Sequence, residues 1–362
     1  MGKNNCNSIT IAKAIGIILM VVGHSGCPQM LSKFIYLFHM PLFFFCSGIF
    51  FSELNGHKAA IQFLKKRIKG LYVPFVKWSV LFLLLHNLLM SVGIYNTSYG
   101  YEGGSSYYTL SEMVHKLIGI LFTMHDYEEL LGGFWFIRAL FVSSILIVVF
   151  SLLLKSVSKY KYEILCVFFL IITIVIRRFA PDPEFWRDIS MGTFGAFFYM
   201  SGYFLMQYRH YWHNITGAIF CLITMIVSFC HFKDGISMGC GYNKVIPFTF
   251  SALSGTLLTI YFSKQLEIRM PFLTRSLYYI GNHTLEILAL HFLVFRFVSY
   301  LFTIIYGIDV VHVAEHPVIK DIVCPSGYWW IIYSVAGIVI PLLLNRMWKN
   351  IVNKMWKIYG KS

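Results

Sequence analysis

The sequence has few charged side chains, and the two signs are unequally represented. Charged residues make up 13% of the 362 residues, with 30 Lys and Arg against 16 Asp and Glu, whereas about a quarter of a soluble domain is charged. Hydrophobic residues make up 57%, and the mean hydropathy is +0.67. This scarcity of charge excludes an ordinary soluble domain and predicts a polytopic membrane protein.

Closely spaced cysteines are also missing. The eight cysteines form no C-x-x-C pair, so neither a zinc cage nor a redox pair is expected, and no metal site is predicted. Three of them, Cys27, Cys240 and Cys324, would lie outside on the topology given below. A disulfide among them and simple packing thiols both remain open, because pairing cannot be read from sequence alone.

Long apolar stretches account for most of the chain, and ten of them approach the length that a helix needs to cross a bilayer. They predict an all-α integral membrane protein, a bundle of about ten transmembrane helices. No repeat or low-complexity linker divides the chain, so residues 1–362 are expected to form a single membrane domain. The predicted spans are 9–24, 34–52, 71–92, 133–153, 162–178, 191–207, 214–231, 245–263, 283–306 and 328–346.

The net charge of +14 would suit nucleic acid if the cations were clustered on one surface, but they lie mainly in alternate short connections. That pattern orients a membrane protein with its basic connections in the cytoplasm. Both termini are therefore expected inside, in a multi-pass protein of the cytoplasmic (inner) membrane, with membrane lipids and not nucleic acid around it.

The first apolar run carries two groups that a membrane disfavours, Lys13 and His24. They are eleven residues apart, a spacing that brings both side chains to one face of a helix at positions about 16 Å apart along it. A titratable pair held in a membrane is a candidate functional site by default.

These residues also carry a resemblance. Lys13 and His24 match the spacing of the arginine-x10-histidine signature in the first helix of the acyltransferase-3 family, and HMPLFFFCSGIFF, which begins at His39, is similar to the aromatic second-helix motif of its polysaccharide O-acetyltransferase (fucose 4-O-acetylase-like) branch. The resemblance implies a membrane O-acyltransferase that moves an acyl group, most simply acetyl from acetyl-CoA, to a hydroxyl of an envelope or capsular saccharide. His24 is then the expected general base, and Lys13 orients the donor or stabilises charge.

The basic segment His57–Gly70 is the expected donor site. Its cations attract anionic lipid headgroups or, equally, the phosphates of an acyl-CoA. The family has a basic R-x-x-R element in this region that is associated with coenzyme A. Arg67 matches its first arginine, but Gly70 stands at the second, so that role passes to Lys66 or Lys69.

Four further residues are candidates for contact with the acceptor. Arg138 lies in GGFWFIRALF, which resembles the W-F element of the family, and either anchors helix ends or binds the acceptor. His291 matches the histidine that ends the late family element, and Glu286 lies within it; Glu286 either forms an internal ion pair or handles protons. His39 is placed at the outer mouth of the cavity, whereas Ser47 is interpreted as a small packing residue.

The exterior segment from Gly93 to Gly132 has two interpretations. Its tyrosines and small polar residues could face a carbohydrate, or the segment could be an interfacial connection with a short surface helix over Leu110–Phe122. A non-enzymatic function also stays open, an exporter or flippase of a saccharide or lipid-linked precursor. Inverted repeats or broken helices would support that function.

The predicted orientation can be tested with reporter fusions. Alkaline phosphatase fused after Ser362 should be inactive, and green fluorescent protein fused at the same place should be fluorescent. Both outcomes are expected because the carboxyl-terminal tail is predicted to lie in the cytoplasm. An active phosphatase fusion at the carboxyl terminus would contradict the orientation.

Overall fold

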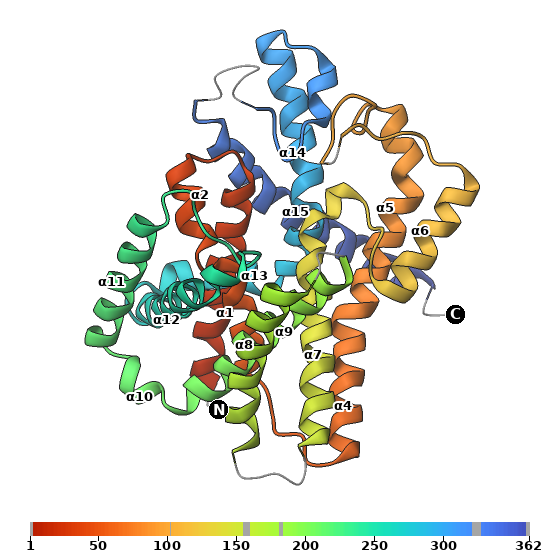
Figure 1. The fold of residues 1–362 in the computed structure, drawn as a ribbon. Coiled ribbons are helices and arrows are strands. Elements are labelled where there is room, and N and C mark those ends of the chain that lie inside the picture. The colour runs from red at the N-terminus through yellow and green to blue at the C-terminus, as the bar shows by residue number, and fades with distance from the viewer. Residues whose placement is uncertain (1–2, 102, 155–159, 181–183, 321–326, 360–362) are drawn as a thin grey trace. The chain divides into compact units, whose positions relative to one another are not determined.

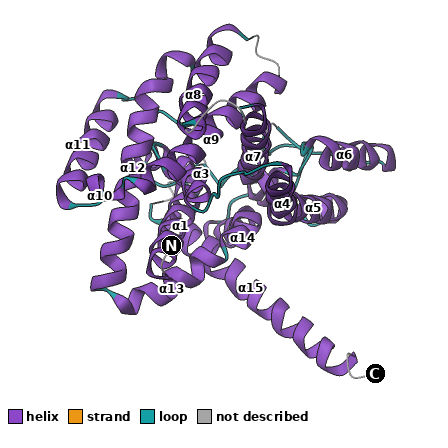
Figure 2. Cartoon of the chain, turned by 90° about the horizontal axis from the view of Figure 1, so that it is seen from below, coloured by secondary structure: helices purple, strands orange, loops and turns teal. Residues whose placement is uncertain are grey.

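The protein is helical throughout the residues that its computed structural model describes, which are 3–101, 103–154, 160–180, 184–320 and 327–359. No strand occurs within these ranges (Figure 2). The predicted all-α class is therefore confirmed for the described part of the chain. The chain divides into two compact units, and the expectation of a single membrane domain stays a prediction.

Unit 1 comprises Met1–Met20, Gln29–Val76 and Trp135–Gly281. Its helices, with the two elements that run on into unit 2 given in full, are α1 (Lys3–His24), α2 (Gln29–Tyr36), α3 (His39–Ile49), α4 (His57–Arg67), the π-helix η1 (Ile68–Tyr72), α7 (Trp135–Leu153), α8 (Lys161–Phe179), α9 (Glu184–Gln207), α10 (Arg209–Trp212), α11 (Ile215–His231), η3 (Tyr242–Lys244), α12 (Val245–Arg269) and α13 (Pro271–Asn282).

Unit 2 comprises Val21–Pro28, Lys77–Phe134 and Asn282–Ser362. It contains the last turn of α1, most of α5 (Val73–Ser91), α6 (Leu110–Thr123), η2 (Glu129–Phe134), α14 (Thr284–Tyr306), η4 (Val310–Ala314) and α15 (Trp329–Tyr359).

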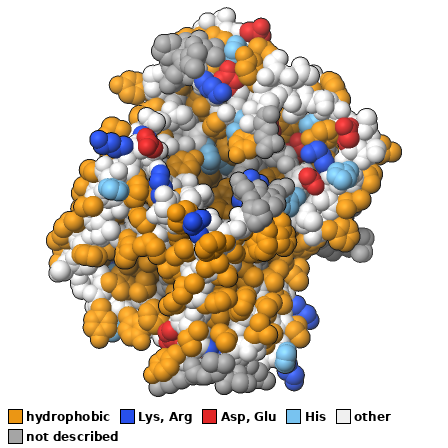
Figure 3. Space-filling view, viewed as in Figure 1, with side chains coloured by type: hydrophobic (Ala, Val, Ile, Leu, Met, Phe, Trp, Pro, Cys, Tyr) orange, Lys and Arg blue, Asp and Glu red, His pale blue; other side chains and the backbone are white. Residues whose placement is uncertain are grey.

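Seven helical stretches of the described chain are long and apolar enough to cross a membrane. Each coincides with one of the ten predicted spans, and the other three predictions, 162–178, 191–207 and 214–231, coincide with α8, α9 and α11. On the face shown in Figure 3, hydrophobic side chains cover much of the surface, as lipid contact requires. The protein is thus a multi-pass membrane protein; the number of ten spans and the orientation stay predictions.

The second predicted span is not one continuous helix. The stretch 34–52 contains the end of α2 and the whole of α3, with a break at Leu37 and Phe38. Pro41 then lies in the first turn of α3, where a missing backbone N–H removes no hydrogen bond from the helix. The break lets α3 begin in a new direction.

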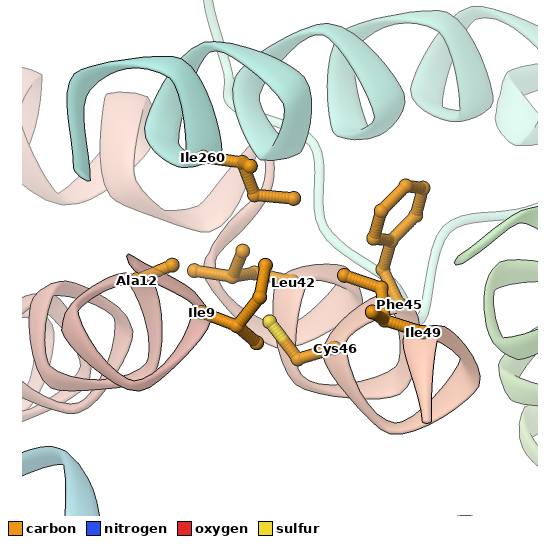
Figure 4. Packing of buried hydrophobic residues seen from close by; sticks show 7 residues of the cluster. All are labelled: Ile9, Ala12, Leu42, Phe45, Cys46, Ile49 and Ile260. Carbon is orange, nitrogen blue, oxygen red and sulfur yellow. The ribbon is translucent and has the colours of Figure 1, made fainter. Parts of the chain in front are cut away.

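The core of unit 1 forms where α1, α3 and α12 meet. Figure 4 shows their side chains converging in one apolar cluster of nearly fully buried residues, namely Ile9, Ala12, Leu42, Phe45, Cys46, Ile49 and Ile260. Helix α9 packs against α3, α7 and α8, and lies beside α7 and α8 in Figure 1. The apolar motif that begins at His39 is therefore used in packing.

Glycines bring α3 and α9 into close contact. A Cβ added to Gly48 would lie 1.7 Å from the carbonyl oxygen of Tyr199, and one added to Gly202 would lie 2.1 Å from that of Phe45. No other residue fits at either position without moving a backbone, and such close approach is how helices associate in membranes.

In unit 2, α14 packs against α15, η2 and η4. Helix α6 confirms the predicted surface helix almost residue for residue. Thr109 and Glu112 form a capping box at its start, which satisfies two otherwise unpaired backbone donors. Tyr108, which precedes the cap, is held by Asn87 of α5. The amide of Asn87 donates to the carbonyl of Tyr108 and accepts from its N–H.

Substitution of Gly48 tests the close contact of α3 and α9. Gly48→Ala should lower the stability of the folded protein by about 1–3 kcal/mol, the usual cost of overpacking. The measurement is thermal unfolding of the purified protein in detergent. Gly70→Ala is the matched control, since a Cβ at Gly70 meets nothing within 4 Å, and equal losses in both variants would contradict the argument.

Candidate functional site

Unit 2 gathers three histidines around one phenylalanine, and we call His24, His291, Phe292 and His316 the histidine cluster. His24 is the last residue of α1, His291 and Phe292 lie on α14, and His316 follows η4. The ring centroid of His24 lies 5.7 Å from that of His291 and 5.1 Å from that of Phe292. Phe292 in turn lies 4.0 Å from His291 and 4.6 Å from His316. Two of the predicted residues, His24 and His291, are therefore neighbours.

His291 is fully buried and has a defined tautomer. Its Nδ1 lies 3.1 Å from the carbonyl oxygen of Ile287 and 3.0 Å from that of Leu288. Carbonyls only accept hydrogen bonds, so Nδ1 carries the proton and the Nε2 of the neutral ring presents a lone pair. That Nε2 has no hydrogen-bond partner among the described residues.

His316 is the third imidazole, and the sequence reasoning did not identify it. Burial, and next the positive charge of Arg296, lower the pKa of the His316 ring to about 3. Its ring also lies 5.3 Å from that of Tyr101, edge to face. His316 is consequently neutral at physiological pH, and its ring has one nitrogen that donates and one that accepts a hydrogen bond.

A buried ion pair holds the surroundings of the cluster. Arg296 of α14 is only 1% exposed, and its Nη2 donates to Glu129 Oε1 at 2.8 Å. Its Nη1 donates to the carbonyls of Val313, at 3.0 Å, and Glu315. Glu129 Oε2 accepts the backbone N–H of Tyr101 at 2.7 Å. One guanidinium thereby ties α14 to η2 and to the segment that carries His316.

Two glycines let η2 approach both buried imidazoles. A Cβ on Gly133 would lie 2.5 Å from a methyl of Leu288 and 3.9 Å from His291 Cε1. One on Gly132 would lie 3.2 Å from the ring of Phe292 and 3.9 Å from His316. Larger residues in η2 would therefore press against Leu288 and Phe292, the neighbours of these imidazoles.

Another buried histidine, His86 of α5, supports the segment from Gly93 to Gly132. Its Nδ1 lies 2.8 Å from Glu128 Oε2, its Nε2 lies 2.9 Å from the carbonyl oxygen of Ser106, and its ring stacks on Tyr108 at 3.5 Å. Burial, and next the charge of Glu128, raise the pKa of the Tyr108 hydroxyl. These contacts pin the start of α6 to α5.

The remaining expected acceptor residues lie elsewhere. Arg138 forms an ion pair with Asp188 of α9. This contact is consistent with the first of the two interpretations, an arginine that anchors helix ends. His39 is 2% exposed, and its Nδ1 donates to the carbonyl of Ile35 at 2.9 Å. Glu286 is half-buried in the first turn of α14, where a carboxylate faces the positive end of the helix dipole.

The expected donor residues lie on α4 and η1 in unit 1, as does Lys13 on α1. Arg67 donates to the hydroxyl of Tyr199, and its guanidinium lies over the rings of Phe63 and Tyr199 at 4.8 and 5.3 Å. Lys66 and Lys69 are exposed. The arginine is thus held by packing, while the two lysines are accessible to a ligand.

Two alternative nucleophile sites have little support in the fold. Ser47 donates its hydroxyl to the carbonyl of Phe43 within α3 at 2.9 Å. The sequence GISMG at 235–239 matches the G-x-S-x-G pattern, but it lies in the connection between α11 and η3 and not at the strand-to-helix turn that exposes such a serine. Of the cysteines that are expected outside, Cys240 accepts a hydrogen bond from the Arg177 guanidinium through its carbonyl at 2.7 Å, and Cys324 lies outside the described residues.

Two comparisons with known proteins found matches. The acyltransferase domain family (Acyl_transf_3) matches residues 7–346. Nodulation protein NolL of Mesorhizobium japonicum is 29% identical over 158 residues, which are 40% of this chain and 36% of NolL. The chain therefore aligns with little more than a third of that relative. No solved structure matches the chain.

Removal of one partner of the buried ion pair tests its structural role. Arg296→Met should destabilise the protein by about 3–5 kcal/mol because it leaves the Glu129 carboxylate buried without its cation. The double variant Arg296→Met, Glu129→Leu should recover part of that loss in thermal unfolding. A double variant less stable than Arg296→Met would show that the two side chains act independently.

Proposed function

The chain belongs to the acyltransferase domain family, and on that premise we propose that it is a membrane-bound O-acyltransferase. It transfers an acyl group, acetyl in the simplest case, from acyl-CoA to a hydroxyl of an envelope or capsular saccharide. The observation that carries the proposal is the histidine cluster, in which His24, the residue expected as base, is half-buried at the end of α1 beside a second imidazole.

His24 acts as the general base. A hydroxyl attacks a thioester carbonyl efficiently only if its proton is removed as the new bond forms, and an imidazole is the side chain suited to that transfer near neutral pH. The neighbouring groups support this role, because Arg296 is neutralised by Glu129 and His316 is uncharged. A protonated His24 is therefore not opposed by an uncompensated cation among these neighbours.

Cytoplasmic acyl-CoA is the donor, and its phosphates bind on α4 and η1. Lys66 and Lys69 present exposed ammonium groups one turn apart, and phosphate oxygens form charge-assisted hydrogen bonds with such cations. Arg67 supports this surface through Tyr199 and Phe63. The π-helical turn that follows, Ile68–Tyr72, is of a kind frequent at functional sites. Lys13 orients the donor or stabilises the charge that develops on it.

The test compares surface polysaccharide from wild-type, deletion and His24→Ala cells by proton NMR. Base-labile acetyl signals should disappear in both mutants while the amount of saccharide is unchanged, since loss of a general base costs about 10²–10⁴-fold in rate. His115→Ala, a change of an exposed histidine on α6, is the matched control and should keep the signals.

The other outcomes separate the enzyme from a transporter. Loss of saccharide from the surface, with its acetyl content intact, would replace the acyltransferase by an exporter. Full acetylation in the deletion strain would contradict the choice of acceptor.

A further inference from the structure

We propose that His291 is a positioning residue that stabilises His24 while His24 holds the proton taken from the acceptor hydroxyl. This inference rests on the proposed function. It assigns to the buried lone pair of His291 Nε2 a hydrogen bond that forms only as the reaction proceeds.

The tautomer of His291 leaves one ring nitrogen that can only accept a hydrogen bond. Two helix carbonyls, those of Ile287 and Leu288, accept from Nδ1, and they hold the ring in place. The Nε2 lone pair is consequently directed away from the helix backbone and can only accept. A lone pair on this nitrogen is the acceptor that a neighbouring imidazolium N–H requires.

That lone pair is buried and has no donor within the described part of the chain. His291 is 0% exposed, and Nε2 has no partner among the described residues. A buried polar atom left without a hydrogen bond costs about 1–3 kcal/mol, and such an atom in a folded protein requires a physical explanation. An interaction made only in the transition state is such an explanation, because it accelerates the reaction without tightening substrate binding.

The rings of His24 and His291 lie close enough for a small movement to join them. Their centroids are 5.7 Å apart and their planes are inclined by 39°. A hydrogen bond needs the two nitrogens about 3 Å apart, so a small approach of the rings makes it. Catalytic hydrogen bonds often tighten in this way when the substrate binds. Among the other titratable or charged groups of unit 2, His316 interacts electrostatically with both His24 and His291, and Arg296, which is paired with Glu129, interacts with His316.

In the proposed step, the acyl group passes from sulfur to oxygen while one proton passes through His24. The acceptor oxygen forms a bond to the acyl carbon, the carbon–sulfur bond of the thioester breaks, and the hydroxyl proton passes to His24. The imidazolium of His24 donates its second N–H to His291 Nε2. The proton then leaves His24 for the thiolate of the released coenzyme, and both histidines return to the neutral state.

Two variants of His291 separate this role from packing. His291→Asn keeps a donor for the helix carbonyls but lacks a group at the position of Nε2, whereas His291→Gln offers an amide oxygen near that position. The assay uses the purified full chain in nanodiscs, radiolabelled acetyl-CoA, and polysaccharide extracted from the deletion strain. Incorporation of label is measured as a function of pH, acetyl-CoA and polysaccharide concentration.

His291→Asn should lower kcat about 10–100-fold with both KM values unchanged. The acidic limb of its pH–rate profile should also move to lower pH, because protonated His24 is no longer stabilised and protonates only in stronger acid. His291→Gln should restore part of kcat and return the limb toward the wild-type position. His115→Asn should match the wild type throughout.

The results that overturn the inference differ from those that overturn the proposed function. No labelling by the wild-type protein contradicts the acyltransferase assignment itself. Labelling by the wild type together with an unchanged kcat and pH profile in His291→Asn contradicts only the role of His291. Equal losses in the Asn and Gln variants, with an unmoved acidic limb, show that His291 serves packing alone.

Discussion

The ion pair of Arg296 with Glu129 is the constraint on which the architecture of unit 2 depends. A guanidinium at 1% exposure is tolerated only if its charge is compensated. Glu129 supplies the charge, and the carbonyls of Val313 and Glu315 take further hydrogen bonds. Three segments distant in sequence must therefore meet at α14. His316 follows Glu315 directly, and Gly132 and Gly133 lie in the same short helix as Glu129, so the pair also fixes the neighbours of the histidine cluster.

The same rule governs unit 1, where cations on apolar helices are satisfied by local partners. Arg138 is paired with Asp188. Arg177 of α8 donates instead to neutral acceptors, among them the hydroxyl of Ser190 and the carbonyls of Met238 and Cys240. A charged residue within a predicted span therefore identifies a place of tight polar packing. It does not by itself identify a residue that takes part in chemistry.

Local patterns predicted the elements well and the contacts between distant segments poorly. Hydropathy located helices at all ten predicted spans, and the surface helix α6 was predicted because its apolar and capping residues are neighbours in sequence. The break at Leu37 and Phe38 was missed, although Pro41 marks it in the sequence, because proline suits the first turn of a helix and not its interior. Glu129 and His316 were missed for another reason: Glu129 lies 167 residues from Arg296, and nothing near His316 in the sequence marks it. An arginine within an apolar run, such as Arg296, requires a partner, but only the fold identifies which one.

Two buried nitrogens of α14, Arg296 Nε and His291 Nε2, have no hydrogen-bond partner among the described residues, and the second belongs to a ring that lies beside that of His24. Leu, Phe and Met side chains would fill the place of His291 without an unsatisfied atom, and the neighbouring Leu288, Phe292 and Phe295 show that apolar side chains suit this position. A lone pair kept without a partner in the resting protein lowers stability, so its retention is best explained by a donor that appears during turnover. Within unit 2, protonated His24 is a donor whose ring centroid lies 5.7 Å from that of His291, and its protonation is the event that the proposed acyl transfer requires.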